Sequence, residues 1–162
     1  MTAQRPSRGD EPIGGMAAPL LYHVAYCSRA AEGVSDADVA AIVASAKRHN
    51  PVYGITGMLV FGSGVFFQWL EGPRVPVQRL MTMLRADPRH HDVVALSESE
   101  EERDRLFPDW DMELVGPDHI RDVLADALDS ADDPLNTVVL KQLLAHLDSA
   151  LLVDLATPGA MG

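Results

Sequence analysis

The sequence predicts an α+β fold: a ferredoxin-like βαββαββ sheet with two helices on one face, followed by C-terminal helices. Two observations predict it. Strand-like runs and helical apolar patterns alternate between residues 20 and 115, and one pair of β-rich runs flanks a glycine-rich turn. Because a mostly antiparallel sheet of this kind needs a helical layer over its apolar face, we expect both helices of the repeat on the same side.

The first strand is predicted over Leu20–Ser28, an apolar run with β-branched and aromatic members. A helix is predicted to begin at Ser35, which together with Asp38 resembles a capping box. Apolar residues at helical spacing extend this helix to His49. Pro51 is expected to end it, because a residue before proline avoids the helical conformation.

Two further β-rich runs, Ile55–Phe61 and Val65–Leu70, are joined by Gly62-Ser63-Gly64 and predict a hairpin. A second helix with one apolar stripe is predicted over Pro73–Arg85. Two more strands complete the predicted sheet, over Val93–Leu96 and Trp110–Val115.

The chain of 162 residues divides into three segments. Residues 1–19 are rich in Gly, Pro, Ser and Arg and are expected to form a flexible leader. Residues 20–115 hold every aromatic side chain and are expected to form the main domain. Residues 116–162 carry eight Asp against two basic residues, a net charge of −6, and are expected to form an acidic helical extension.

Two helices are predicted in this extension, at about His119–Ser130 and Leu135–Leu155. The second has a heptad-like leucine stripe, and we expect the pair to cover either the other face of the sheet or a partner. The stripe consists of Leu140, Leu144, Leu147 and Leu151.

The amino-acid composition argues against several classes of function. Acidic residues outnumber basic ones by 24 to 13, giving a net charge of −11, which argues against direct binding to nucleic acid or to an anionic membrane. Cys27 has no second cysteine to pair with. Because we find neither an apolar run long enough to span a membrane nor a signal peptide pattern, we expect a cytoplasmic protein.

Three polar side chains stand out against apolar surroundings. Gln68 lies in a run that is apolar on both faces, so the strand is expected to be central, and an unpaired buried amide costs about 1–3 kcal/mol. Each of the three has a purely structural explanation: Gln68 can hold a bulge, Tyr26 can bond a backbone carbonyl, and Asn50 can cap a helix. The alternative is that all three surround one slot between the two helices, as in a cofactor pocket.

Six short motifs occur in order along residues 20–115 and together resemble the BLUF domain, the blue-light sensor that uses FAD. They are Tyr26-Cys-Ser28, His49-Asn50, Gly54-Ile-Thr-Gly57, Phe66-Phe-Gln-Trp-Leu-Glu-Gly72, Asp87-Pro-Arg-His90 and Phe107-Pro-Asp-Trp-Asp-Met112.

The resemblance implies a photochemical mechanism. Tyr26 matches the light-reactive tyrosine of the family, Gln68 the glutamine between it and the flavin, and Asn50 the asparagine at the flavin carbonyl edge. In the family, light drives an electron and then a proton from the tyrosine to the flavin, the glutamine rearranges its hydrogen bonds, and the absorption shifts to the red.

Trp110 and Met112 are two residues apart and are expected on the same face of the last strand. The resemblance implies that this pair exchanges places beside the glutamine, whereas the alternative is a plain core role for both. We expect the rearrangement at Gln68 to pass through this strand to the C-terminal helices.

The resemblance also implies the rest of the site. Ile42, His49 and Asp87 are expected near the flavin ring, although core packing explains Ile42 equally well. The cofactor is expected to be FAD, with FMN a possible replacement. We expect no metal site, because the adjacent His90 and His91 point apart on an extended segment.

We expect a photoreceptor without enzymatic activity, which forms a homo-oligomer and acts through a downstream regulatory protein. Two alternatives remain from the fold: a flavin-free ferredoxin-like interaction module and a small acylphosphatase-like hydrolase. The hydrolase needs a cradle of backbone amides for an anion, and no glycine-rich phosphate loop is present in the sequence. The joint presence of Tyr26, Asn50 and Gln68 favours the sensor.

Overall fold

The computed structural model describes residues 20–147. The predicted leader and the end of the second predicted tail helix, with Leu151, lie outside the described residues. One five-stranded sheet has the order β4-β1-β3-β2-β5 and four helices flank it. The strands are β1 (Leu20–Ala30), β2 (Thr56–Gly62), β3 (Val65–Gly72), β4 (His90–Glu102) and β5 (Glu113–Val115); the helices are α1 (Asp36–Tyr53), α2 (Arg74–Arg85), α3 (Ile120–Ser130) and α4 (Pro134–Leu147).

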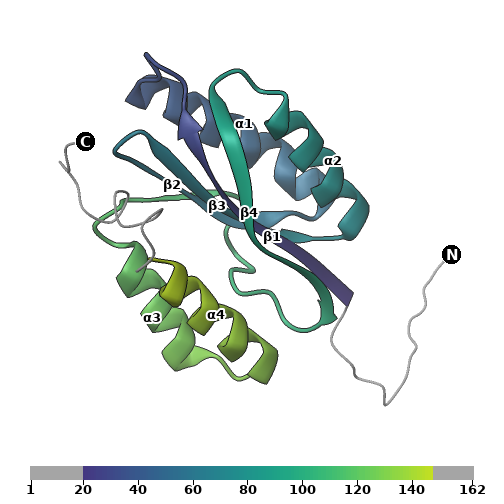
Figure 1. Ribbon diagram of the computed structural model, residues 1–162. Helices are drawn as coiled ribbons and strands as arrows, with labels where there is room; N and C mark the ends of the chain where they lie inside the picture. Colours follow the sequence, from purple (N-terminus) through teal and green to yellow (C-terminus); the bar gives the residue numbers. More distant parts are fainter. Residues whose placement is uncertain (1–19, 148–162) are drawn as a thin grey trace, which may run out of the picture.

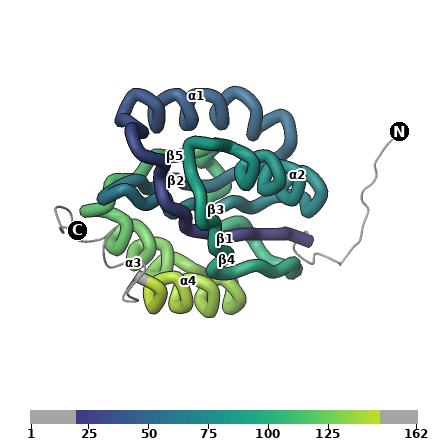
Figure 2. Tube along the Cα trace, turned by 45° about the horizontal axis from the view of Figure 1, so that its top comes forward, coloured from purple at the N-terminus to yellow at the C-terminus, as the bar shows by residue number. Residues whose placement is uncertain are grey.

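The elements form three layers, with α1 and α2 on one face of the sheet and α3 and α4 on the other (Figures 1 and 2). Each face has its own apolar cluster. β3 is buried along its whole length because it is central and covered on both sides. The predicted pair of helices on one face is therefore confirmed, and the C-terminal helices cover the other face, with Leu140 and Leu143 fully buried against it.

The hairpin between β2 and β3 is confirmed. Gly62 pairs with Val65, so the loop has two residues. Ser63 and Gly64 have φ of 52° and 73°, the left-handed values that a two-residue type I′ turn requires and that match the twist of the strands.

The prediction that Pro51 ends the first helix is wrong. α1 begins at the predicted Ser35 capping box but continues to Tyr53. Pro51 lies inside the last turn, and the helix ends three residues later, where Gly54 takes a left-handed φ of 73°. Asn50 is thus inside the helix rather than a cap, and its side chain is buried.

Two strand predictions are wrong in length. β4 runs over 13 residues instead of the predicted Val93–Leu96, because its ladder with β1 continues through polar residues at the edge of the sheet. β5 has three residues and pairs in parallel with β2. Trp110 and Met112 consequently precede the last strand, in an irregular segment.

His23 of β1 lies fully buried on the α3/α4 face, stacked on Trp69 with ring centroids 4.4 Å apart. Burial, assisted by the Arg103 charge, lowers its pKa to about 3. Between that value and the ordinary pKa near 6.5, the unfolded chain binds a proton that the folded chain does not. Acidification from pH 7 therefore destabilises the fold through His23.

We expect His23→Gln to flatten the dependence of the unfolding free energy on pH. Between pH 7 and pH 5, His23 should lower the free energy of unfolding of the wild type by about 2 kcal/mol, because each pH unit below 6.5 costs about 1.4 kcal/mol. Urea unfolding of both proteins at each pH measures this difference. His119→Gln, at an exposed position, is the control and should keep the wild-type slope; equal slopes for His23→Gln and wild type would contradict the assignment.

Candidate functional site

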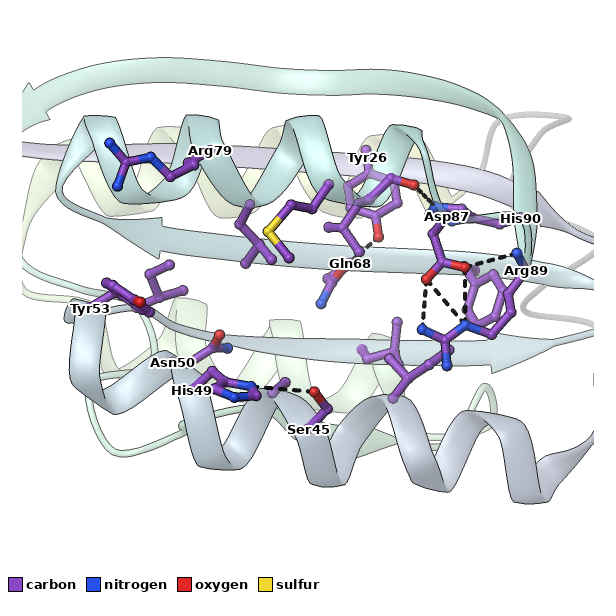
Figure 3. Close-up of a pocket in the computed structure, with 18 of the residues that line it drawn as sticks. Tyr26, Ser45, His49, Asn50, Tyr53, Gln68, Arg79, Asp87, Arg89 and His90 are labelled. Carbon is purple, nitrogen blue, oxygen red and sulfur yellow. Dashed lines mark hydrogen bonds and ion pairs between the residues drawn. The ribbon is translucent and has the colours of Figure 1, made fainter.

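A cavity of about 360 Å³ lies between α1, α2 and the sheet (Figure 3), within the size range of cofactor sites. One face of each helix lines it, with residues three and four apart as helical geometry requires. α1 contributes Ile42, Ser45, Ala46, His49, Asn50 and Tyr53, and α2 contributes Pro76, Arg79, Leu80, Met83 and Leu84.

The sheet supplies the side of the cavity that holds Tyr26 and Gln68. These residues are directly opposite each other on the antiparallel strands β1 and β3, so their side chains project from neighbouring positions into the same space. Leu59 of β2 is the next residue in the same row across the sheet and also lines the cavity.

A chain of hydrogen bonds passes through Gln68. The Tyr26 hydroxyl donates to Gln68 Oε1, and Gln68 Nε2 donates to Met112 Sδ at 3.3 Å. All three side chains are buried, at 2%, 4% and 0% exposure. Since a thioether is a weak acceptor and an amide nitrogen has two hydrogens, the Gln68 amide keeps donor capacity toward the cavity.

Burial, and secondarily the Asp87 charge, raises the pKa of Tyr26 far above that of an ordinary phenol. The side chain therefore holds its proton at physiological pH. A neutral phenol bonded to an amide oxygen in a desolvated site can lose an electron and its proton together, with the proton path already in place.

The segment before β5 is fixed to three elements that border the cavity. Gly57 N–H donates to the Trp110 carbonyl at 2.8 Å, and Asn50 Nδ2 donates to the Asp111 carbonyl at 2.9 Å. With the contact from Gln68 to Met112, residues 110–112 are joined to β2, α1 and β3.

One end of the cavity carries a charged pair. Arg89 Nη2 donates to Asp87 Oδ2 at 2.7 Å, and Arg89 Nε lies 3.0 Å from Oδ1. These bonds lower the pKa of Asp87, so its carboxylate stays charged. Figure 3 shows this pair at the opposite end from Arg79 and Tyr53, with Tyr26 and Gln68 between them.

The structure brings together most of the residues singled out in the sequence. Tyr26, Ile42, His49, Asn50, Gln68 and Asp87 all line the cavity, and Met112 contacts Gln68. Their roles in light sensing stay predictions.

Trp110 is placed elsewhere, and the prediction that it shares a face with Met112 is wrong. Trp110 packs against the apolar cluster under α3 and α4, stacked on Phe107 at 4.8 Å, whereas Met112 belongs to the cluster under α1 and α2. The two-residue spacing predicts a shared face only in a regular strand, and β5 begins after both residues.

Several polar lining residues were missed in the sequence: Ser45, Tyr53, Arg79 and Arg89. Their spacing carries a usable signal, because Ser45 and Tyr53 lie three residues from Ile42 and Asn50 on the same helix face. No group of three or more potential metal ligands occurs within residues 20–147. In that range no helix combines the length and the apolar character needed to cross a membrane.

The cavity suits a flat heterocycle that carries polar groups on its edges. Apolar side chains from both helices and the sheet form most of its walls, including Ile42, Leu80 and Leu59. Amide and hydroxyl groups are gathered on Gln68, Asn50 and Ser45. These groups offer both donors and acceptors to a ring that carries carbonyl and N–H groups.

A family model described as sensors of blue light using FAD (BLUF) matches residues 21–113. Photoactivated adenylate cyclase subunit beta of Euglena longa is 41% identical over 76 residues, covering 47% of this chain and 9% of that protein. The subunit beta-like protein FB of Euglena gracilis is 32% identical over 134 residues, covering 78% of this chain and 15% of that protein. The chain therefore spans a small part of these curated relatives.

Solved structures show the same fold. The dark-state structure of BlrB, a BLUF protein, superimposes with a TM-score of 0.61 at 31% identity, covering 79% of this chain and 98% of that one. BlrP1 BLUF gives 0.65 at 29% identity, covering 80% and 90%. The agreement in sequence and fold identifies this chain as a member of the BLUF family of blue-light flavin sensors.

Proposed function

We propose that the chain is a blue-light photoreceptor that binds FAD between α1 and α2 and signals through a change in the hydrogen bonds of Gln68. One observation carries the proposal: the Tyr26 hydroxyl donates to Gln68 Oε1 inside the cavity. When bound, the flavin supplies light absorption and a one-electron acceptor. Ile42 and Leu80 would hold the ring from the two helices, and Asn50 and His49 would face its polar edge.

Tyr26 is the electron donor in this proposal. Its oxidation by one electron makes the phenolic O–H strongly acidic, so that bond breaks and the proton moves along the existing hydrogen bond to Gln68 Oε1. Gln68 releases a proton from Nε2 toward the cavity, which leaves its carboxamide as the imidic tautomer. The return of the electron and the proton restores Tyr26, while Gln68 relaxes with altered donor and acceptor positions.

The altered Gln68 no longer fits Met112. If Gln68 returns to the amide form in the turned-over orientation, Oε1 faces Met112 Sδ, and neither atom carries a hydrogen to donate. The contact now made at 3.3 Å is then lost, and Met112 shifts within the segment that leads to β5. We include in this proposal that Trp110 and Met112 exchange places beside Gln68, and that the resulting movement is passed on to α3 and α4.

The proposal includes output through other molecules rather than through catalysis. The photoactivated adenylate cyclases match this chain over 9% and 15% of their own length. We also propose that the protein is a homo-oligomeric sensor with a downstream regulatory protein and that it accepts FMN as well as FAD.

The decisive experiment is an absorption spectrum of the purified protein. It should contain bound flavin, and blue light should shift the flavin bands to the red, with recovery in the dark. A flavin-free protein, or one whose bands do not move under light, would refute the proposal.

We expect Gln68→Leu to bind flavin and to lose the red shift entirely. Leucine fills a similar volume but offers neither an acceptor to Tyr26 nor a donor to the cavity. Phe66→Leu is the matched control, because Phe66 lies two residues earlier on the same face of β3 and also lines the cavity. Light-minus-dark spectra should show a shift in the control; a normal shift in Gln68→Leu would remove Gln68 from the mechanism.

A further inference from the structure

A second hollow, of about 350 Å³, lies on the opposite side of the sheet, between the segment before β5 and helix α3. Most of its apolar lining is half-buried against the core, whereas Phe107 is buried and Pro108 is exposed. Trp110 and Phe107 form one wall as a stacked pair with an interplanar angle of 8°. Leu106, Pro108, Val123 and Ala127 complete the apolar part of the lining.

The rim of this groove is acidic. Asp109 and Asp126 are exposed at its edge, and no Lys, Arg or His is among the residues that line it. An apolar groove edged by carboxylates is complementary to a large apolar side chain flanked by Lys or Arg.

The groove is joined to the flavin cavity by a short stretch of backbone. Trp110 forms a wall of the groove, and its carbonyl accepts a hydrogen bond from Gly57. Two residues later, Met112 accepts the hydrogen bond of Gln68. A displacement of Met112 therefore acts on the position of the Trp110 ring, which shapes the groove.

We propose that the groove between residues 106–110 and α3 docks a segment of a partner protein that carries a large apolar side chain next to Lys or Arg. We further propose that its affinity differs between dark and light, a clause that rests on the proposed photosensor function. The chain's own copies are poor occupants, because each carries a net charge of −11. Residues 148–162 contain Asp148 and Asp154 and no Lys or Arg, so the same repulsion applies to them.

The test uses the full flavin-bound protein and a random peptide library displayed on phage as the probe. Selected peptides should pair an aromatic or large aliphatic residue with Lys or Arg. Fluorescence anisotropy measures their affinity, with a label on the peptide that is excited by red light, which flavin does not absorb. Affinity should fall at least about tenfold in Ala127→Arg, because the arginine side chain fills the groove. Asp126→Lys, a surface change that does not touch the core, should weaken binding about threefold to tenfold.

Asp118→Lys is the matched control. It makes the same charge change at an exposed position before α3 that does not line the groove. It should change affinity less than about twofold. Equal weakening by Asp118→Lys and Asp126→Lys would show general attraction to an acidic surface and overturn the proposal.

Four other outcomes would also overturn it. They are selected peptides without basic residues, no peptide enriched above background, self-association of the protein that Ala127→Arg abolishes, and peptide binding that appears only after Leu151 and Leu152 are changed to Asp. A normal red shift with equal peptide affinity in light and dark would overturn the light-dependent clause alone. Loss of the red shift in the wild-type protein would refute the photosensor, while peptide binding in the dark would still support the groove.

Discussion

Tyr26→Phe is expected to abolish the light-induced red shift completely while flavin remains bound. The substitution removes the hydroxyl that donates to Gln68 Oε1 and leaves the ring, so the cavity keeps its shape. Without this phenol, Gln68 receives neither the proton nor the change in its acceptor bond. Flavin content after purification and light-minus-dark spectra measure the two parts of the expectation separately.

Tyr22→Phe provides a close control for this experiment. Tyr22 lies on the same face of β1 and is also buried, but its hydroxyl donates to Glu98. Burial and the Glu98 bond raise its pKa to about 12, so it resembles Tyr26 in protonation while standing outside the cavity lining. It should show a wild-type shift. A full shift in Tyr26→Phe, or loss of the shift in both variants, would contradict the assigned role.

The fold could be predicted where apolar periodicity and turn chemistry agree. β3 is apolar on both faces and is central, and the hairpin before it has Gly64 at one of its two left-handed turn positions. The extent of β4 could not be predicted, because its polar half is held by pairing with β1 at the sheet edge. A strand stabilised mainly by backbone pairing leaves no alternation in its sequence.

The site could be predicted only in part, for a related reason. The direct pairing of Tyr26 with Gln68 depends on the register of β1 against β3, and residues 42 apart in the sequence carry no sign of that register. The apolar surroundings of Tyr26 and Gln68 singled out both residues, and the resemblance to a family supplied their roles. It did not supply the places of Trp110 and Met112, because a regular strand was assumed where the structure has an irregular segment.

Glu71→Ala is expected to destabilise the protein by about 3–5 kcal/mol, the cost of breaking a buried ion pair by removing one partner. Glu71 is fully buried near the end of β3. Its carboxylate accepts the backbone N–H groups of Leu106 and Phe107, at 3.0 Å and 2.8 Å, and lies 3.5 Å from Arg103 Nη1. Alanine leaves two backbone donors unpaired, and the buried Arg103 guanidinium keeps only the half-buried Glu101 carboxylate, 3.8 Å from its Nε, as a counter-charge.

Urea unfolding in the dark, compared with Glu113→Ala at an exposed strand position, measures this loss; the control should change stability by less than about 0.5 kcal/mol. A second comparison separates the lost charge from the lost backbone bonds. Adding Arg103→Met to Glu71→Ala removes the buried cation, and it should return part of the stability if the uncompensated charge dominates. The recovery must stay incomplete, because Arg103 also donates to His23 Nδ1 and Asn136 Oδ1. A double variant less stable than Glu71→Ala would show that the hydrogen bonds of Arg103 to His23 and Asn136 outweigh the cost of its uncompensated charge.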